Sequence, residues 1–131
     1  MFFYETTVQE THLDVFGHMN NARYLELFEQ ARWDIITQNG FGLAKIKETG
    51  QGPVILEAHL RFLKELYART KIKISVECTE YNGKVGKLKQ EMINDKGEVC
   101  AELIVVFALF DLKARKIITA TDEWKHAVGI K

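Results

Sequence analysis

The sequence contains a single serine, a single proline and two cysteines, so several enzyme chemistries have few residues to use. Ser75 lies in an alternating, strand-like segment without a Gly-x-Ser-x-Gly motif, which argues against a serine nucleophile. Cys78 and Cys100 lie in apolar runs, away from any predicted helix start or neighbouring histidine, which argues against a cysteine nucleophile. We expect both to be reduced core thiols of a cytoplasmic protein, and a disulfide between them is the alternative.

The sequence also lacks an excess of charge of either sign. Its 18 Lys and Arg residues balance its 18 Asp and Glu residues, so no basic surface for nucleic acid is expected. No segment approaches the ~20 apolar residues of a membrane span, and residues 1–5 do not resemble the start of a signal peptide. The length of 131 residues predicts one domain over residues 1–131.

Hydrophobic periodicity predicts one long helix. The alternation of apolar and polar residues predicts a strand over residues 2–11. Over residues 22–38 the apolar residues instead recur at helical spacing, +4, +3 and +4. The residues at this spacing are Tyr24, Phe28, Ala31 and Ile35. The apolar part of this helix is broad, so other elements must enclose it. Asn39 and Gly40 predict its end, and a glycine-rich connection is expected from there to Pro53.

After Pro53 apolar and polar residues alternate again, as in β-strands. This pattern predicts four further strands, over residues 56–62, 71–78, 85–93 and 99–110. Asn82-Gly83 and Asn94–Gly97 are typical hairpin turns, so the four strands are expected to form an antiparallel meander. Thr121 predicts the cap of a short final helix that contains Trp124. The predicted fold class is α+β: a mainly antiparallel curved sheet of about five strands wrapped around one long helix. So short a chain cannot easily cover the outer face of such a sheet, which predicts self-association.

The loop before the long helix carries the chemistry-bearing residues. Asp14 is followed by Gly17 and His18, and then by Asn20 and Asn21 at the predicted helix start. An asparagine there can cap the helix, and the free N–H groups with the helix dipole favour developing negative charge. The alternative is a capped helix with a solvated aspartate.

An aspartate can attack an activated acyl carbon or act as general base on water. Its carboxylate is a weak base, so the substrate needs a good leaving group, and a thioester supplies one. Backbone N–H groups near Asn21 can hold the carbonyl oxygen, and one such donor is worth ~3–4 kcal/mol. His12, Asp14 and His18 share this loop, but no second pair at ligand spacing accompanies them, so no metal site is predicted.

The stretch from Asp14 to Arg32 resembles the hotdog-fold acyl-CoA thioesterases of the 4-hydroxybenzoyl-CoA thioesterase type. The likeness lies in the Asp-x-x-Gly of the loop, the Asn-Asn before the helix and the Phe-Glu-x-Ala-Arg over residues 28–32. It continues as a strand pattern through residues 53–63 and on to Phe110. The hotdog fold is itself a sheet wrapped around one long helix.

This resemblance implies hydrolysis of acyl-CoA thioesters to a free acid and CoA, without a cofactor. It implies that Asp14 is the nucleophile or general base and that N–H groups near Asn21 polarise the thioester carbonyl. It also implies homodimers or homotetramers with the substrate tunnel between subunits. The chain departs from the family pattern at His12, where many relatives carry an acid, and at residues 65–69, where many carry a Pro and a Gly-Asp turn.

Six further residues are the candidates for substrate binding or for the oxyanion site: Gly17, His18, Asn20, Asn21, Tyr24 and His59. His59 lies on the polar side of its strand, as a surface or interface histidine or as a residue that reaches the partner's site. Three basic residues are candidates for the CoA phosphates or are solvated charges: Arg61, Lys64 and Arg69. The sequence does not fix the length or aromaticity of the acyl group, because Phe16, Tyr24 and Phe28 suit a pocket for either.

Two other functions stay open on the sequence. The first is an acyl-thioester dehydratase or hydratase that uses Asp14 and His18 as an acid–base pair, although such sites place acid and base across the substrate from each other. The second is a non-catalytic acyl-CoA-binding module, because a fold alone does not establish chemistry.

Overall fold

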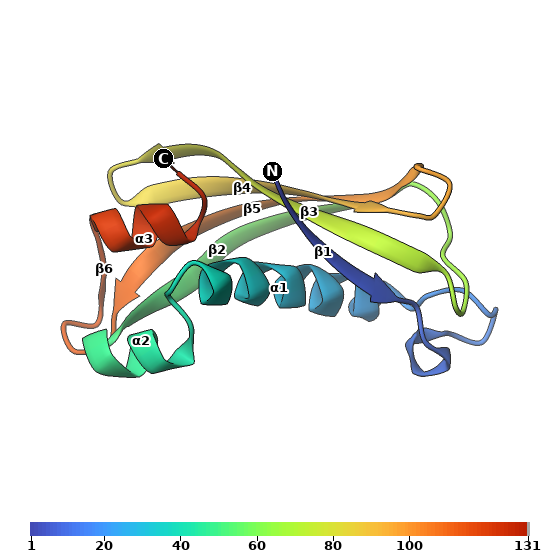
Figure 1. Ribbon diagram of the computed structural model, residues 1–131, viewed down its shortest axis with the longest axis horizontal. Coiled ribbons are helices and arrows are strands. Elements are labelled where there is room, and N and C mark those ends of the chain that lie inside the picture. Colours follow the sequence, from blue (N-terminus) through green and yellow to red (C-terminus); the bar gives the residue numbers. More distant parts are fainter. Residues whose placement is uncertain (131) are drawn as a thin grey trace.

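A computed structural model describes residues 1–130, and it confirms the predicted sheet wrapped around one helix (Figure 1). The strands are β1 (Phe2–Thr7), β2 (Gln51–Phe62), β3 (Lys71–Asn82), β4 (Val85–Ile93), β5 (Val99–Asp111) and β6 (Lys116–Ile118). The helices are α1 (Asn21–Gln38), α2 (Leu43–Thr49) and α3 (Asp122–Ala127), with a single-turn 3-10 helix, η1 (Glu10–His12). The strand order is β1-β3-β4-β5-β2, with β6 beside β5, and every pairing is antiparallel.

The helix α1 lies in the concave side of the sheet because its apolar stripe faces inward. The buried residues of α1 are those that the sequence spacing predicts, together with one neighbour: Tyr24, Phe28, Ala31, Ile35 and Ile36. They join one core cluster with the buried face of β3, which alternates with exposed Lys71 and Lys73. The amphipathic pattern of the sequence therefore fixes which face of α1 is enclosed.

The hairpin β3-β4 and the hairpin β4-β5 confirm the central part of the predicted meander. The prediction that the strand over residues 56–62 continues this meander is wrong, because β2 pairs with β5 and not with β3. The strand β5 is apolar on both faces except at Glu102, which is typical of a central strand, and the backbone N–H and C=O groups of a central strand need a strand partner along each edge. Pairing with β2 supplies the second one, and it leaves β2 at the edge of the sheet.

The structure differs from the prediction at several boundaries and in elements that were not predicted. The strand β2 begins at Gln51 rather than at residue 56, and β3 ends at Asn82 rather than at residue 78. The first strand ends at Thr7 rather than at residue 11, because Gln9 and His12 close the turn of η1 through reciprocal hydrogen bonds. The predicted connection over residues 40–53 contains α2, whose last turn ends at Gly50 in the left-handed conformation (φ 71°). The short strand β6 was not predicted. The predicted final helix is confirmed as α3, with Thr121 as its cap.

The edge strand β2 presents apolar side chains that the rest of the described chain does not cover. Ile55, Leu56 and Phe62 are between 42% and 51% exposed, and Leu63 just beyond the strand is 45% exposed. No helix among residues 1–130 combines the length and the apolar character that crossing a bilayer requires.

Candidate active site

The loop between η1 and α1 folds back on itself and presents Asp14 near the start of α1. Leu13 and Met19 form an isolated antiparallel bridge, and the Asp14 N–H donates to the His18 carbonyl over 2.8 Å. The turn closes because the Gly17 N–H donates to the Asp14 carbonyl over 3.2 Å and Gly17 takes φ 80°. That left-handed conformation is strained for any residue with a Cβ, so Gly17 shapes the turn. Gly17 was predicted as a substrate-binding or oxyanion residue, and it is not among the residues that line the hollow described below.

The Asp14 carboxylate is held on one side only. Its Oδ1 accepts from the Phe16 N–H over 2.8 Å and from the His18 N–H over 3.2 Å. Its Oδ2 has no hydrogen-bond partner among residues 1–130. The two backbone donors fix the orientation of the carboxyl plane, and the second oxygen stays available to a substrate or a water molecule.

The start of α1 confirms the predicted asparagine cap and identifies it as Asn20. Its Oδ1 accepts from the Ala22 N–H over 2.9 Å, and its own N–H donates to the His12 carbonyl over 2.8 Å. The N–H of Asn21, the first residue of the helix, has no acceptor among residues 1–130. It is a free donor at the positive end of an 18-residue helix, which is the arrangement that binds an anionic oxygen.

Four of the predicted site residues line one hollow of about 290 Å³: Asp14, His18, Asn21 and Tyr24. The end of β2 and the segment that follows, from Phe62 to Glu65, also line it. The Tyr24 ring packs edge-on against Phe62, with 5.0 Å between ring centroids. Burial raises the pKa of Tyr24 to about 12, so its hydroxyl stays protonated and remains a donor at neutral pH.

The structure does not bring His59 to this hollow. Leu60, its neighbour on β2, packs against the core and pairs with buried Leu103, so the side chain of His59 points to the other face of the sheet. His59 pairs with Ile104 there and is exposed.

Sequence reasoning missed two residues beside the loop, Glu65 and Tyr67. Glu65 Oε2 lies 3.3 Å from His18 Nε2 and accepts from the Tyr67 hydroxyl over 2.9 Å. The hydrogen bond to Glu65 raises the pKa of Tyr67. The one sequence signal was that residues 65–69 depart from the pattern that the resemblance implies.

Two of the three basic residues considered for CoA phosphates already have carboxylate partners. Lys64 Nζ pairs with Glu98, and Arg69 Nε donates to Glu10 over 2.9 Å. Arg61 is exposed on β2. A phosphate would therefore compete with Glu98 or Glu10 for the first two.

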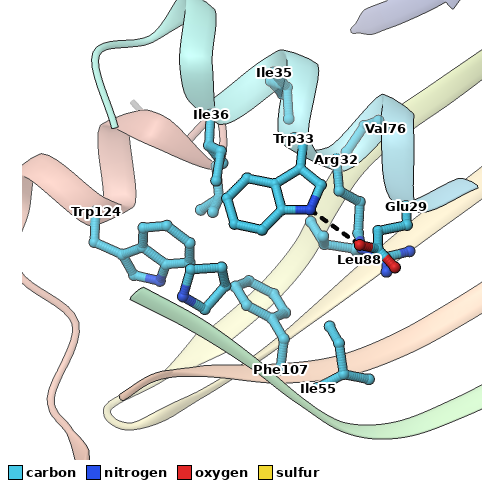
Figure 2. Close-up of a pocket in the computed structure, with 12 residues that line it drawn as sticks. Glu29, Arg32, Trp33, Ile35, Ile36, Ile55, Val76, Leu88, Phe107 and Trp124 are labelled. Atoms are coloured by element: carbon cyan, nitrogen blue, oxygen red, sulfur yellow. Dashed lines mark hydrogen bonds between the residues drawn. The ribbon is translucent and has the colours of Figure 1, made fainter. Parts of the chain in front are cut away.

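An apolar cavity of about 200 Å³ lies farther along α1, between the helix, β2 and α3 (Figure 2). Trp33, Ile55 and Phe107 line it together with Trp124 (Figure 2). Arg32 enters its wall from α1 and donates to Gln90 over 3.0 Å. Burial lowers the pKa of Arg32.

The part of the chain that the structure describes contains no group of three His, Cys, Asp or Glu side chains placed to hold a metal ion. Cys78 and Cys100 are both free thiols, and burial raises the pKa of each. Neither cysteine lines the hollow at Asp14.

Comparison with known proteins gives matches over most of the chain. Residues 8–128 match the thioesterase-like superfamily. The chain is 31% identical over 120 residues to the long-chain acyl-CoA thioesterase FadM of Escherichia coli, covering 91% of this chain and 90% of that protein.

Among solved structures, the chain is similar to the probable thioesterase YbaW of Escherichia coli, with 28% identity and a TM-score of 0.85 over 96% of this chain and 95% of the other. A Staphylococcus aureus protein solved in complex with CoA has a TM-score of 0.91 at 18% identity, over 97% of this chain and 80% of the other. At that identity the likeness shows the fold alone.

Proposed function

The chain belongs to the thioesterase-like superfamily, and from that premise we propose that it hydrolyses acyl-CoA thioesters to a free acid and CoA. The observation that carries the proposal is that a carboxylate oxygen and a backbone N–H group, both without a hydrogen-bond partner, belong to residues that line one hollow. Asp14 Oδ2 and the Asn21 N–H both lack a partner among residues 1–130, and both residues line the hollow. The similarity to the long-chain acyl-CoA thioesterase FadM supports the substrate class.

In the proposed reaction the thioester carbonyl lies between Asp14 and the start of α1. As nucleophile, Asp14 attacks the carbonyl carbon and forms an acyl anhydride with loss of the CoA thiolate, and water then hydrolyses the anhydride to the free acid and the Asp14 carboxylate. As general base, Asp14 instead removes a proton from the water that attacks the carbonyl carbon directly. The negative charge on the carbonyl oxygen is stabilised by the Asn21 N–H, and one such donor contributes ~3–4 kcal/mol. The CoA thiolate leaves without a general acid, because it is a good leaving group. A hydroxylamine trap for an acyl-Asp14 anhydride distinguishes the two roles of Asp14.

We assign the acyl tail to the apolar cavity along α1. At ~1.5 Å per residue, the stretch of α1 from Asn21 to Trp33 measures about 18 Å, so only a long tail reaches from the hollow to the cavity. An apolar cavity of about 150 Å³ is enough to bind benzene, and this one is about 200 Å³. Long apolar acyl groups are therefore the preferred substrates.

We further propose that the protein forms a homodimer, or a tetramer of two such dimers, through β2. The outer edge of β2 has no strand partner among residues 1–130, and an unpaired apolar edge favours association with a second copy. Light scattering at micromolar concentration should give at least twice the 15.1 kDa of one chain. A monomer mass would contradict this proposal.

The hydratase alternative has less support from the geometry. Asp14 and His18 lie in one turn, joined by the backbone hydrogen bond from the Asp14 N–H to the His18 carbonyl and by the bond from the His18 N–H to Asp14 Oδ1. Both residues line the hollow from this one turn. A hydratase needs its acid and base on opposite sides of the substrate.

The variant Asp14→Asn tests the proposed chemistry. Asn keeps an oxygen for the two backbone donors, so the loop and the oligomer should be unchanged, while the nucleophile or base is lost. Thiol release from an acyl-CoA should fall by about 10²- to 10⁴-fold, with the binding of CoA preserved. An Asp14→Asn protein that keeps most of its kcat would contradict the mechanism.

A further inference from the structure

We propose that Glu65 is a positioning residue for the loop that carries Asp14. With Tyr67 it holds the His18 side chain, and through His18 it fixes the backbone groups that orient the Asp14 carboxylate. This inference rests on the proposed function, since it concerns turnover at the same site. It concerns the segment in which the chain departs from the family pattern, residues 65–69.

A backbone hydrogen bond brings the two segments together. The Met19 N–H donates to the Leu66 carbonyl over 2.8 Å. Both of these side chains are enclosed by the core, Met19 at 3% exposure and Leu66 at 1%. The residues that flank Leu66, Glu65 and Tyr67, point the other way and meet His18, which precedes Met19.

Three contacts connect the His18, Glu65 and Tyr67 side chains. His18 Nε2 lies 3.3 Å from Glu65 Oε2, and the Tyr67 hydroxyl donates to that same oxygen over 2.9 Å. The Tyr67 ring also packs edge-on against the His18 imidazole, with 5.4 Å between centroids. Through these contacts Tyr67 restricts the orientation of the Glu65 carboxylate and of the His18 imidazole.

The backbone of His18 carries this restraint to Asp14. The His18 N–H donates to Asp14 Oδ1 over 3.2 Å, and the His18 carbonyl accepts from the Asp14 N–H over 2.8 Å. A shift of His18 therefore moves both the carboxylate and its backbone. A misplacement of about 1 Å in a reacting group can cost about 10²-fold in rate.

The exposure of the pair indicates when the restraint acts. The side chains of His18 and Glu65 are 32% and 59% exposed, and polar side-chain pairs as exposed as this one add little to folding stability. A substrate in the hollow displaces water, which strengthens the interaction, and contacts that are poorly aligned in the free enzyme tighten in the complex. The role of Glu65 should therefore appear in kcat and not in thermal stability.

The experiment measures kcat, KM and the melting temperature of four proteins on one long-chain acyl-CoA. Glu65→Ala should lower kcat by about tenfold with KM unchanged, and Tyr67→Phe should lower it by about two- to fivefold. The control is Glu80→Gln, which removes a carboxylate paired with Lys87 over 3.1 Å near the β3-β4 turn, and it should match the parent. A rise in KM alone, an unchanged kcat, or a kcat loss that follows a loss of melting temperature would overturn the proposal.

A double-mutant cycle tests whether Glu65 acts through His18. If it does, the double variant Glu65→Ala/His18→Asn should be no slower than His18→Asn alone, because the two changes remove one interaction. Additive losses would show that Glu65 acts independently of His18 and would overturn the proposal.

Nitrogen NMR of the His18 imidazole tests the role of Glu65 independently of the proposed function. The imidazole nitrogen resonances of His18, assigned by their loss in His18→Asn, should indicate a proton on Nε2 in the parent and should change in Glu65→Gln. If the parent hydrolyses no acyl-CoA, the proposed function fails, and these resonances still decide whether Glu65 holds His18. Unchanged His18 resonances in Glu65→Gln would overturn the inference.

Discussion

The two ends of α1 differ in how completely their polar groups are paired. At the N-terminal end, the Asn21 N–H and Asp14 Oδ2 have no partner among residues 1–130. At the C-terminal end, the Trp124 indole N–H donates to the Tyr81 hydroxyl over 2.9 Å, and the Asn39 amide donates to the Ala127 carbonyl over 3.1 Å. Figure 1 shows that α2 and α3 both lie at this second end, with the loop of the site at the other.

This difference indicates that the N-terminal end of α1 serves the reaction and that its C-terminal end contributes to the stability of the fold. Unpaired donors and carboxylates contribute little to folding, but they are what a developing oxyanion and an acyl carbon require. The aromatic packing at the other end holds α1 against the sheet, so the free groups at its start keep their positions. Changes at the two ends should therefore have different signatures.

The largest effect on stability is expected from Phe41→Ala. Phe41 is 2% exposed and packs edge-on against Trp124, with 5.1 Å between centroids. Its truncation should lower the free energy of unfolding by about 3–5 kcal/mol, measured by urea denaturation at one fixed protein concentration. Phe41 lines neither the hollow nor the cavity, so kcat on a short acyl-CoA at low temperature should be retained. A stability loss below about 1 kcal/mol would contradict the assigned role of this end.

An intermediate effect, confined to long substrates, is expected from Trp33→Ala. Trp33 forms part of the wall of the apolar cavity (Figure 2). Loss of its indole should lower kcat/KM for a long-chain acyl-CoA by about tenfold, since each methylene contact in a pocket is worth ~1–3 kcal/mol. Values for a short acyl-CoA should not change. Equal losses of kcat/KM for the long and the short acyl-CoA would show that the acyl tail does not bind in this cavity.

The smallest effects are expected from the loss of one helix cap at each end of α1. Asn20→Ala removes the cap of α1 and Thr121→Ala removes the cap of α3, where Thr121 Oγ1 accepts from the Trp124 N–H over 3.1 Å. Each should cost about 1 kcal/mol in the free energy of unfolding. Only Asn20→Ala should also lower kcat, because Asn20 fixes the backbone beside Asn21, and Asn20→Asp should restore both quantities. Equal kcat values in the two alanine variants would show that the cap does not position the oxyanion donor.

Features that depend on local sequence were predictable. The spacing of buried residues predicts α1, alternation predicts β3 and β4, and a threonine before two acidic residues predicts the cap of α3. The short helix α2 was missed because its flanking glycines suggested a loop, although Gly50 in the left-handed conformation is a common helix end. The edge position of β2 depends on pairing with β5, about 50 residues farther along the chain, and periodicity carries no information on such pairings.

The same distinction applies to the site. Asp14, Gly17 and Asn20 lie within one turn and a helix start, so their roles in the loop follow from residue type and spacing. Glu65 meets His18 only because the backbone of Leu66 bonds to that of Met19. A contact between segments 47 positions apart could not be predicted from either segment alone.

We expect the open end of α1, with Asp14 and the Asn21 N–H, to be the place where an acyl thioester is hydrolysed. The most direct measurement is thiol release by the purified protein over a panel of long, short and aromatic acyl-CoAs, with crotonyl-CoA included. We expect many turnovers per chain and the highest kcat/KM on long apolar acyl groups. Tight binding of CoA without thiol release, or hydration of crotonyl-CoA without hydrolysis, would contradict this expectation.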